Sequence, residues 1–291
     1  MSNNPLAEVF GFPLDNQTAE AQRYRKTKLC PFNNKVPSCT KDKALDPLGV
    51  CSIFEESGEA TITCPVRFRE DWMIADDAAA FFFSPDASWT SLTEVRLKDA
   101  TGLSAGNIDV VLVSYDNHGK LLDFASLEVQ AVYISGNVRN PFEAYIKTPQ
   151  VTKPWEGPNY PRPDYLSSSR KRLVPQMLYK GGIFQAWGKK QAVALHKSFY
   201  ATLPELPQVE PQKADIAWFL YDLQLSKTED RYVLNKYKTV YTAFEPALLR
   251  ITTAPAGPIG DFINHLQAKL DDRLNSPDAP TLQDMLSGSN N

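Results

Sequence analysis

The segment IDVVLVSYDNHGKLLDFASLEVQAVYI, residues 108–134, decides the fold. Residues 108–115 and 124–134 are rich in β-branched and aromatic side chains, which favour strands. The turn formers Asn-His-Gly at 117–119 lie between these two runs. The segment therefore predicts an antiparallel β-hairpin.

Acidic side chains fall on this hairpin and on the strand predicted before it, residues 91–97. Glu128 and Gln130 are two residues apart on one strand, so they project from the same face. Asp109 begins the other strand, and Glu94 adds a third carboxylate. Neighbouring carboxylates repel one another unless a hard cation lies between them, and Mg²⁺ suits one or two carboxylates with phosphate oxygens and water. The alternative is that these carboxylates face solvent.

Strand and helix patterns alternate on both sides of the hairpin. Helical spacing is found in residues 70–83, in 170–184 after a serine cluster, and in 261–274, and further strands are predicted at 191–196 and 216–223. This alternation predicts an α/β fold.

All four cysteines fall near the N-terminus in the pattern Cys-x8-Cys-x11-Cys-x12-Cys. Clustered thiols in a protein without an export signal favour a tetrahedral metal site, and thiolates suit iron or zinc. Two disulfides, catalytic thiols and unrelated buried cysteines are the alternatives. We therefore predict a metal-binding lobe over residues 1–66 and a second domain over 67–291. The predicted metal ligands are Cys30, Cys39, Cys51 and Cys64.

The net charge of −3 hides an uneven distribution. Residues 137–200 contain 11 Lys and Arg against 3 Asp and Glu, a net charge of +8, whereas the segments on either side are acidic. Such a strip suits a polyanionic backbone, although a solvated lysine-rich surface is the alternative. A basic cluster at a predicted helix N-terminus is the first candidate for phosphate contact. The residues are Ser168, Ser169, Arg170, Lys171 and Arg172, with Arg139, Lys153, Arg162 and Lys180 as secondary candidates.

The longest apolar runs, such as residues 78–83, are far shorter than a bilayer span. The N-terminus has neither a basic head nor an apolar signal core. We expect a cytoplasmic protein, of bacterial or phage-related origin, without membrane contact.

Residues 94–113 and 126–130 resemble the active-site hairpin of the PD-(D/E)XK nucleases. More narrowly, the chain resembles the NotI family of restriction endonucleases, which has Asp followed by Glu-x-Gln and an N-terminal four-cysteine iron site. The resemblance extends to AEVFG at 7–11, to the cysteine flanks Cys-Pro-Phe, Gly-Val-Cys and Cys-Pro, and more loosely to residues 163–167 and 171–177. These stretches are spread over about half of the chain, and none lies beyond residue 200.

The resemblance implies a PD-(D/E)XK nuclease domain over residues 67–291, whose core is a mixed central sheet flanked by helices, with a DNA-facing segment at 137–200. It implies an Mg²⁺-dependent type II restriction endonuclease that acts as a homodimer on double-stranded DNA and leaves 5′-phosphate ends. Glu94, Asp109 and Glu128 would serve the ion, Asp109 and Glu128 as its ligands, and Gln130 would position the attacking water. The four cysteines would hold iron, or alternatively zinc. A nicking or repair nuclease on the same core, or a DNA-binding protein without catalysis, are the competing interpretations.

Overall fold

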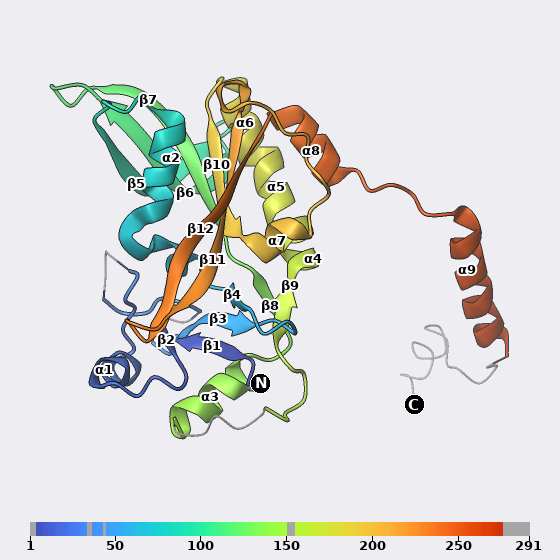
Figure 1. Cartoon of the computed structure of the whole chain (residues 1–291). Coiled ribbons are helices and arrows are strands. Elements are labelled where there is room, and N and C mark those ends of the chain that lie inside the picture. Colours follow the sequence, from blue (N-terminus) through green and yellow to red (C-terminus); the bar gives the residue numbers. More distant parts are fainter. Residues whose placement is uncertain (1–3, 34–36, 43–44, 150–154, 276–291) are drawn as a thin grey trace, which may run out of the picture. The chain divides into compact units, whose positions relative to one another are not determined.

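The predicted hairpin lies within a six-stranded sheet (Figure 1). The computed structural model describes residues 4–33, 37–42, 45–149 and 155–275. The sheet order is β12-β11-β10-β7-β6-β5, in which β10 runs parallel to both neighbours and the other pairs are antiparallel. The strands are β5 (Trp89–Lys98), β6 (Ser104–Tyr115), β7 (Leu121–Gln130), β10 (Gln191–His196), β11 (Ile216–Ser226) and β12 (Arg231–Thr242). The predicted α/β fold with a mixed central sheet is confirmed.

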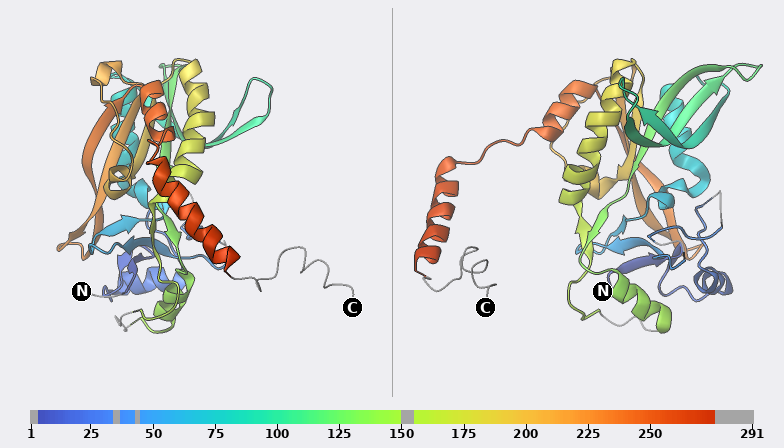
Figure 2. Two further views of the ribbon diagram at one scale, coloured as in Figure 1. Left: turned by 90° about the vertical axis from the view of Figure 1, so that its right-hand side faces the viewer. Right: turned by 180° about the vertical axis from the view of Figure 1, so that it is seen from behind.

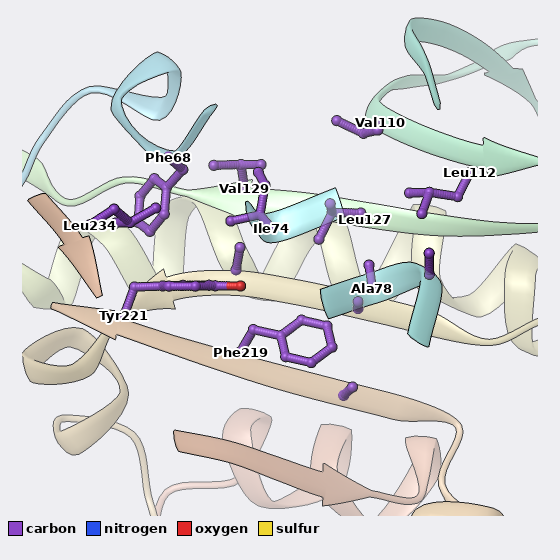
Figure 3. Packing of buried hydrophobic residues seen from close by; sticks show 14 of the residues in the cluster. Phe68, Ile74, Ala78, Val110, Leu112, Leu127, Val129, Phe219, Tyr221 and Leu234 are labelled. Carbon is purple, nitrogen blue, oxygen red and sulfur yellow. The ribbon is translucent and has the colours of Figure 1, made fainter. Parts of the chain in front are cut away.

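The side chains of β7 alternate between the two faces of this sheet, and a hydrophobic core lies on each face. On one face, α2 (Met73–Phe82) packs Ile74 and Ala78 near Leu127 and Phe219 (Figure 3). On the other face, a helical run through residues 165–186 and α8 (Phe244–Thr252) cover the sheet, as the rear view in Figure 2 shows. Since Leu127 faces α2, Glu128 and Gln130 face the helical run.

The helical run begins five residues before the predicted start. Asp164, not a serine, is its N-cap, and the Asp164 carboxylate accepts a hydrogen bond from the Ser167 N–H at 2.9 Å. Pro175 lies inside the helix, and π-helical turns precede and follow it. π-Turns re-route backbone hydrogen bonds that a proline cannot make. The successive segments are α4 (Tyr165–Ser168), η2 (Ser169–Leu173), α5 (Val174–Gln176), η3 (Met177–Gly181) and α6 (Gly182–Ala186).

A second sheet lies in the region where we predicted a metal-binding lobe. Its order is β2-β1-β3-β4, and it adjoins a short two-stranded ribbon and helices near the N-terminus (Figure 1). These strands are β1 (Leu6–Val9), β2 (Phe12–Pro13), β3 (Val50–Phe54) and β4 (Ala60–Ile62), and the ribbon is β8 (Tyr133–Ser135) with β9 (Arg162–Asp164). The other helical segments before residue 252 are α1 (Ala19–Thr27), η1 (Pro65–Trp72), α3 (Arg139–Lys147), α7 (Lys197–Ala201) and η4 (Pro211–Lys213).

The chain divides after Thr252 into two units. The second unit contains α9 (Ile259–Leu274), which confirms the helix predicted at 261–274. None of the α9 residues is buried.

None of the described helices combines the length and apolar character that are needed to cross a bilayer.

Candidate active site

Asp109 and Glu128 face each other where β6 and β7 separate. The last paired residues of these two strands are Val110 and Leu127, and Asp109 and Glu128 are their neighbours just beyond that pair. Asp109 Oδ2 accepts a hydrogen bond from the backbone N–H of Val129 at 2.8 Å, in place of a ladder bond. The structure therefore brings together two of the three predicted carboxylates.

The Glu128 carboxyl group is buried, and only one of its two oxygens accepts a hydrogen bond from a described residue. Glu128 Oε2 accepts a hydrogen bond from Lys180 Nζ at 2.6 Å, whereas the buried Oε1 has no partner among the described residues. Burial, followed by the nearby Asp109 carboxylate, raises the pKa of Glu128 to about 8, although the Lys180 ammonium lowers it. A buried carboxylate oxygen without a partner beside a second carboxylate fits a divalent cation.

Gln130 lies two residues further along the same face of β7. It is buried, and its Nε2 donates a hydrogen bond to Gln176 Oε1 on the helical run. The amide is therefore held at the site by a side chain that sequence reasoning did not select.

Lys180 also contacts the carboxylate pair, whereas we expected it only as a secondary phosphate contact. Its ammonium also donates to the backbone oxygen of Asn107 at 2.8 Å, and the side chain is buried. One signal was present in the sequence: Gln176 and Lys180 are four residues apart, which places them on one helix face.

Glu94 lies apart from the carboxylate pair. Its neighbours Thr93 and Val95 pair with Val110 and Ile108, so Glu94 stands opposite Asp109 in the sheet. However, Glu94 has a φ of 58° and an exposed side chain. Within the described ranges, no group of three or more His, Cys, Asp or Glu residues is arranged to hold a metal ion, so the three carboxylates do not form one cluster.

A cleft of about 940 Å³ opens beside this site. Asp109, Gln130 and Gln176 line it, together with Arg139 and Arg172. The Arg172 guanidinium stacks on the Tyr133 ring at 5.0 Å. The cleft therefore joins Asp109 of the carboxylate pair to basic side chains from the predicted DNA-facing segment.

The predicted phosphate-binding residues divide into two groups. Arg170, Lys171 and Arg172 are exposed on the helical run. Ser168 is buried, accepts a hydrogen bond from the Tyr133 N–H at 2.8 Å and donates to the Asp164 backbone oxygen at 2.6 Å. Because the helix begins at Tyr165, the serines do not form the helix N-terminus that we expected to bind an anion.

The four cysteines are free thiols, and each of Cys30, Cys39 and Cys51 is near enough to Cys64 to feel its charge. Burial raises the pKa of Cys30 to about 11, and the proximity of Cys64 and Cys39 adds to this shift. Burial likewise raises the pKa of Cys39, and that of Cys51 well above the ordinary thiol value. The thiols influence one another electrostatically, but the described part of the chain does not place them in a metal-binding geometry. Residues 34–36 and 43–44, in two of the connecting loops, lie outside the described residues.

Comparison with known proteins gives one finding. A family model described as restriction endonuclease NotI matches residues 8–234, which include the cysteines, the hairpin and the helical run. The match extends beyond residue 200, where our sequence comparison ended. No curated protein matches the chain.

Proposed function

This chain belongs to the restriction endonuclease NotI family, and on that premise we propose that it is a type II restriction endonuclease that depends on Mg²⁺. It would hydrolyse double-stranded DNA at a specific sequence and leave 5′-phosphate ends. The observation that carries the proposal is the Asp109–Glu128 pair, in which the buried Glu128 Oε1 has no partner among the described residues, next to a cleft that Asp109 and Arg172 line.

The roles follow from the positions of the side chains. Asp109 and Glu128 would hold the ion, which would neutralise charge on the phosphate and activate water. Gln130 would position the attacking water by hydrogen bonding, because a neutral amide carries no charge and accepts no proton at neutral pH. Glu94, opposite Asp109 on the edge strand β5, would act on the ion through water.

The DNA partner follows from charge. Arg172 in the cleft, with exposed Arg170 and Lys171, would contact the phosphate backbone. Ser169 is half-buried beside them, whereas Ser168 is buried and would not contact the DNA. We propose a homodimer because symmetric cleavage of both strands of a palindrome requires two related active sites.

Replacement of Glu128 tests the function. Glu128→Ala should lower the cleavage rate in Mg²⁺ at least ~100-fold, which corresponds to about 3 kcal/mol of transition-state stabilisation. DNA binding measured in Ca²⁺ should change little. Glu229→Ala, which removes an exposed carboxylate in the β11–β12 connection, is the matched control and should cut normally.

The products decide between the competing functions. Discrete double-strand breaks at one palindrome in unmethylated DNA support restriction. Nicks or random ends would instead support a nicking or repair nuclease, and intact DNA with retained binding would indicate a protein without catalysis. Wild-type cleavage by Glu128→Ala would refute the assignment of the site.

We also propose that the four cysteines bind structural iron, or alternatively zinc. Four neighbouring free thiols provide the donor set for either metal once they lose their protons. Cys51→Ser should therefore lower the metal content of the purified protein, measured by elemental analysis, and lower its thermal stability. An unchanged metal content would show that the four-thiol hypothesis is wrong.

A further inference from the structure

We propose that Lys180 is a positioning residue for Glu128: it holds Oε2 and thereby presents Oε1 to the catalytic cation. This inference rests on the proposed function. It assigns to the helical run a part in the active site in addition to covering the sheet.

The contacts of Lys180 support this role. Its ammonium donates to Glu128 Oε2 at 2.6 Å and to the Asn107 backbone oxygen at 2.8 Å. Asn107 lies on β6, two residues before Asp109, so Lys180 contacts both strands that carry the carboxylates. With Oε2 held from the helix side, Oε1 is the oxygen left for a cation.

The register of helix and strand places two pairs of side chains side by side. Residues four apart in a helix lie about one turn apart on the same face, and residues two apart in a strand lie about 6.6 Å apart on the same face. Gln176 and Lys180 therefore match Gln130 and Glu128, and each pair is hydrogen-bonded. The hydrogen bond between Gln130 and Gln176 therefore helps to fix the helix in the position in which Lys180 reaches Glu128.

The burial of the Lys180–Glu128 pair favours function over stability. The lysine and glutamate side chains are only 7% and 10% exposed. An apolar pair of similar volume is often at least as stable as a buried ion pair, so stability alone does not account for this one.

The test compares Lys180→Met with Lys180→Arg. Binding of Mn²⁺ without DNA, measured by electron paramagnetic resonance of the free ion, should be ~10-fold weaker for Lys180→Met, a typical effect of losing a group that orients a metal ligand. Loss of a positive charge alone would strengthen cation binding, so weaker binding is specific to lost positioning. Lys180→Arg keeps a charged donor and should bind closer to the wild type. Asp109→Asn should remove the same binding site.

Cleavage supplies a second readout. For Lys180→Met, kcat at saturating Mg²⁺ should fall ~100-fold while DNA affinity in Ca²⁺ stays within threefold. Lys236→Met is the matched control, because Lys236 also donates to a carboxylate, Asp77, at 2.6 Å but on the opposite face of the sheet. That variant should bind Mn²⁺ and cut like the wild type.

Mn²⁺ binding to folded Lys180→Met that is as tight as, or tighter than, that of the wild type would overturn the proposal. If Lys180→Met does not fold, Lys180→Gln, which keeps a donor without the charge, takes its place under the same criterion. A wild-type protein that cuts no DNA would refute the proposed function, whereas the Mn²⁺ measurement would still decide the role of Lys180.

Discussion

The Arg67 side chain is fully buried, and its interactions are structural. Arg67 Nε lies 3.0 Å from Glu8 Oε1, Nη1 lies 2.9 Å from Glu70 Oε2, and Nη2 donates to the Tyr232 backbone oxygen at 2.9 Å. The guanidinium also stacks 4.1 Å from the centre of the Phe32 ring. Burial raises the pKa of Glu8, and the Arg67 charge opposes that shift. One side chain thus connects β1, η1 and β12 beside the cysteines.

Arg67→Met should lower the free energy of unfolding by about 3–5 kcal/mol, because two carboxylates would remain buried without their partner. Arg139→Met is the control: Arg139 also pairs with several carboxylates, but those acidic side chains are exposed, so the loss should be about 1 kcal/mol or less. Urea unfolding measures both variants. Equal losses would show that burial adds nothing to the Arg67 network.

Among the elements, the helical run at residues 165–186 presents its polar side chains in two directions. Gln176 and Lys180 reach the carboxylate end of β7, whereas Arg170 and Lys171 are exposed and Arg172 lines the cleft. The same helix therefore supports both the proposed chemistry and the proposed phosphate contacts.

Arg172→Ala should weaken DNA binding in Ca²⁺ by about 1–2 kcal/mol and lower the slope of log K against log salt by about one unit, because one phosphate contact would be lost. Lys227→Ala removes a lysine in the β11–β12 connection and should leave both quantities unchanged. Fluorescence anisotropy at several salt concentrations measures them. An unaltered salt slope for Arg172→Ala would remove this side chain from the phosphate contacts.

The elements that could be predicted from the sequence are those with strong local patterns. The hairpin, β10 and α9 follow from alternation, apolar runs and helical spacing. The N-terminal strands were not predicted because they have only two to five residues and a bulged register, so tertiary pairing decides them. The helix start was misplaced because Asp164, five residues earlier than expected, provides the cap.

Only the part of the candidate site that lies on the β6–β7 hairpin could be predicted from the sequence. Glu128 and Gln130 share a face by strand geometry alone, and the hairpin turn brings Asp109 beside them. Lys180 is 52 residues from Glu128, and no local pattern encodes that contact. The positive φ at Glu94 depends on the sheet register, which the sequence does not reveal.

On the scale of the whole molecule, a polar cluster at the end of β10 joins both sheets to the helical run. His196 is buried there, and its Nδ1 accepts a hydrogen bond from the Ser198 N–H at 3.3 Å. Glu55, after β3, accepts hydrogen bonds from Thr61 and Tyr165. Lys197 lies 3.2 Å from Glu59 and 3.4 Å from Asp222. Both a positive ammonium and negative carboxylates therefore lie near the His196 imidazole.

Burial lowers the pKa of His196 to about 4 and Lys197 acts in the same direction, whereas Glu55, Asp222 and Glu59 oppose the shift. The unfolded chain takes up a proton on this residue below its ordinary pKa of about 6.5, while the folded protein does not until about pH 4. Protonation of His196 in the unfolded chain should therefore lower the free energy of unfolding by up to about 3 kcal/mol as the pH falls from 6.5 to 4.

His196→Asn keeps an acceptor for the Ser198 N–H and should flatten this part of the curve of unfolding free energy against pH. His265→Asn on exposed α9 is the control and should keep the wild-type slope. An equally steep acid loss in His196→Asn would show that other groups, such as Glu55, cause it.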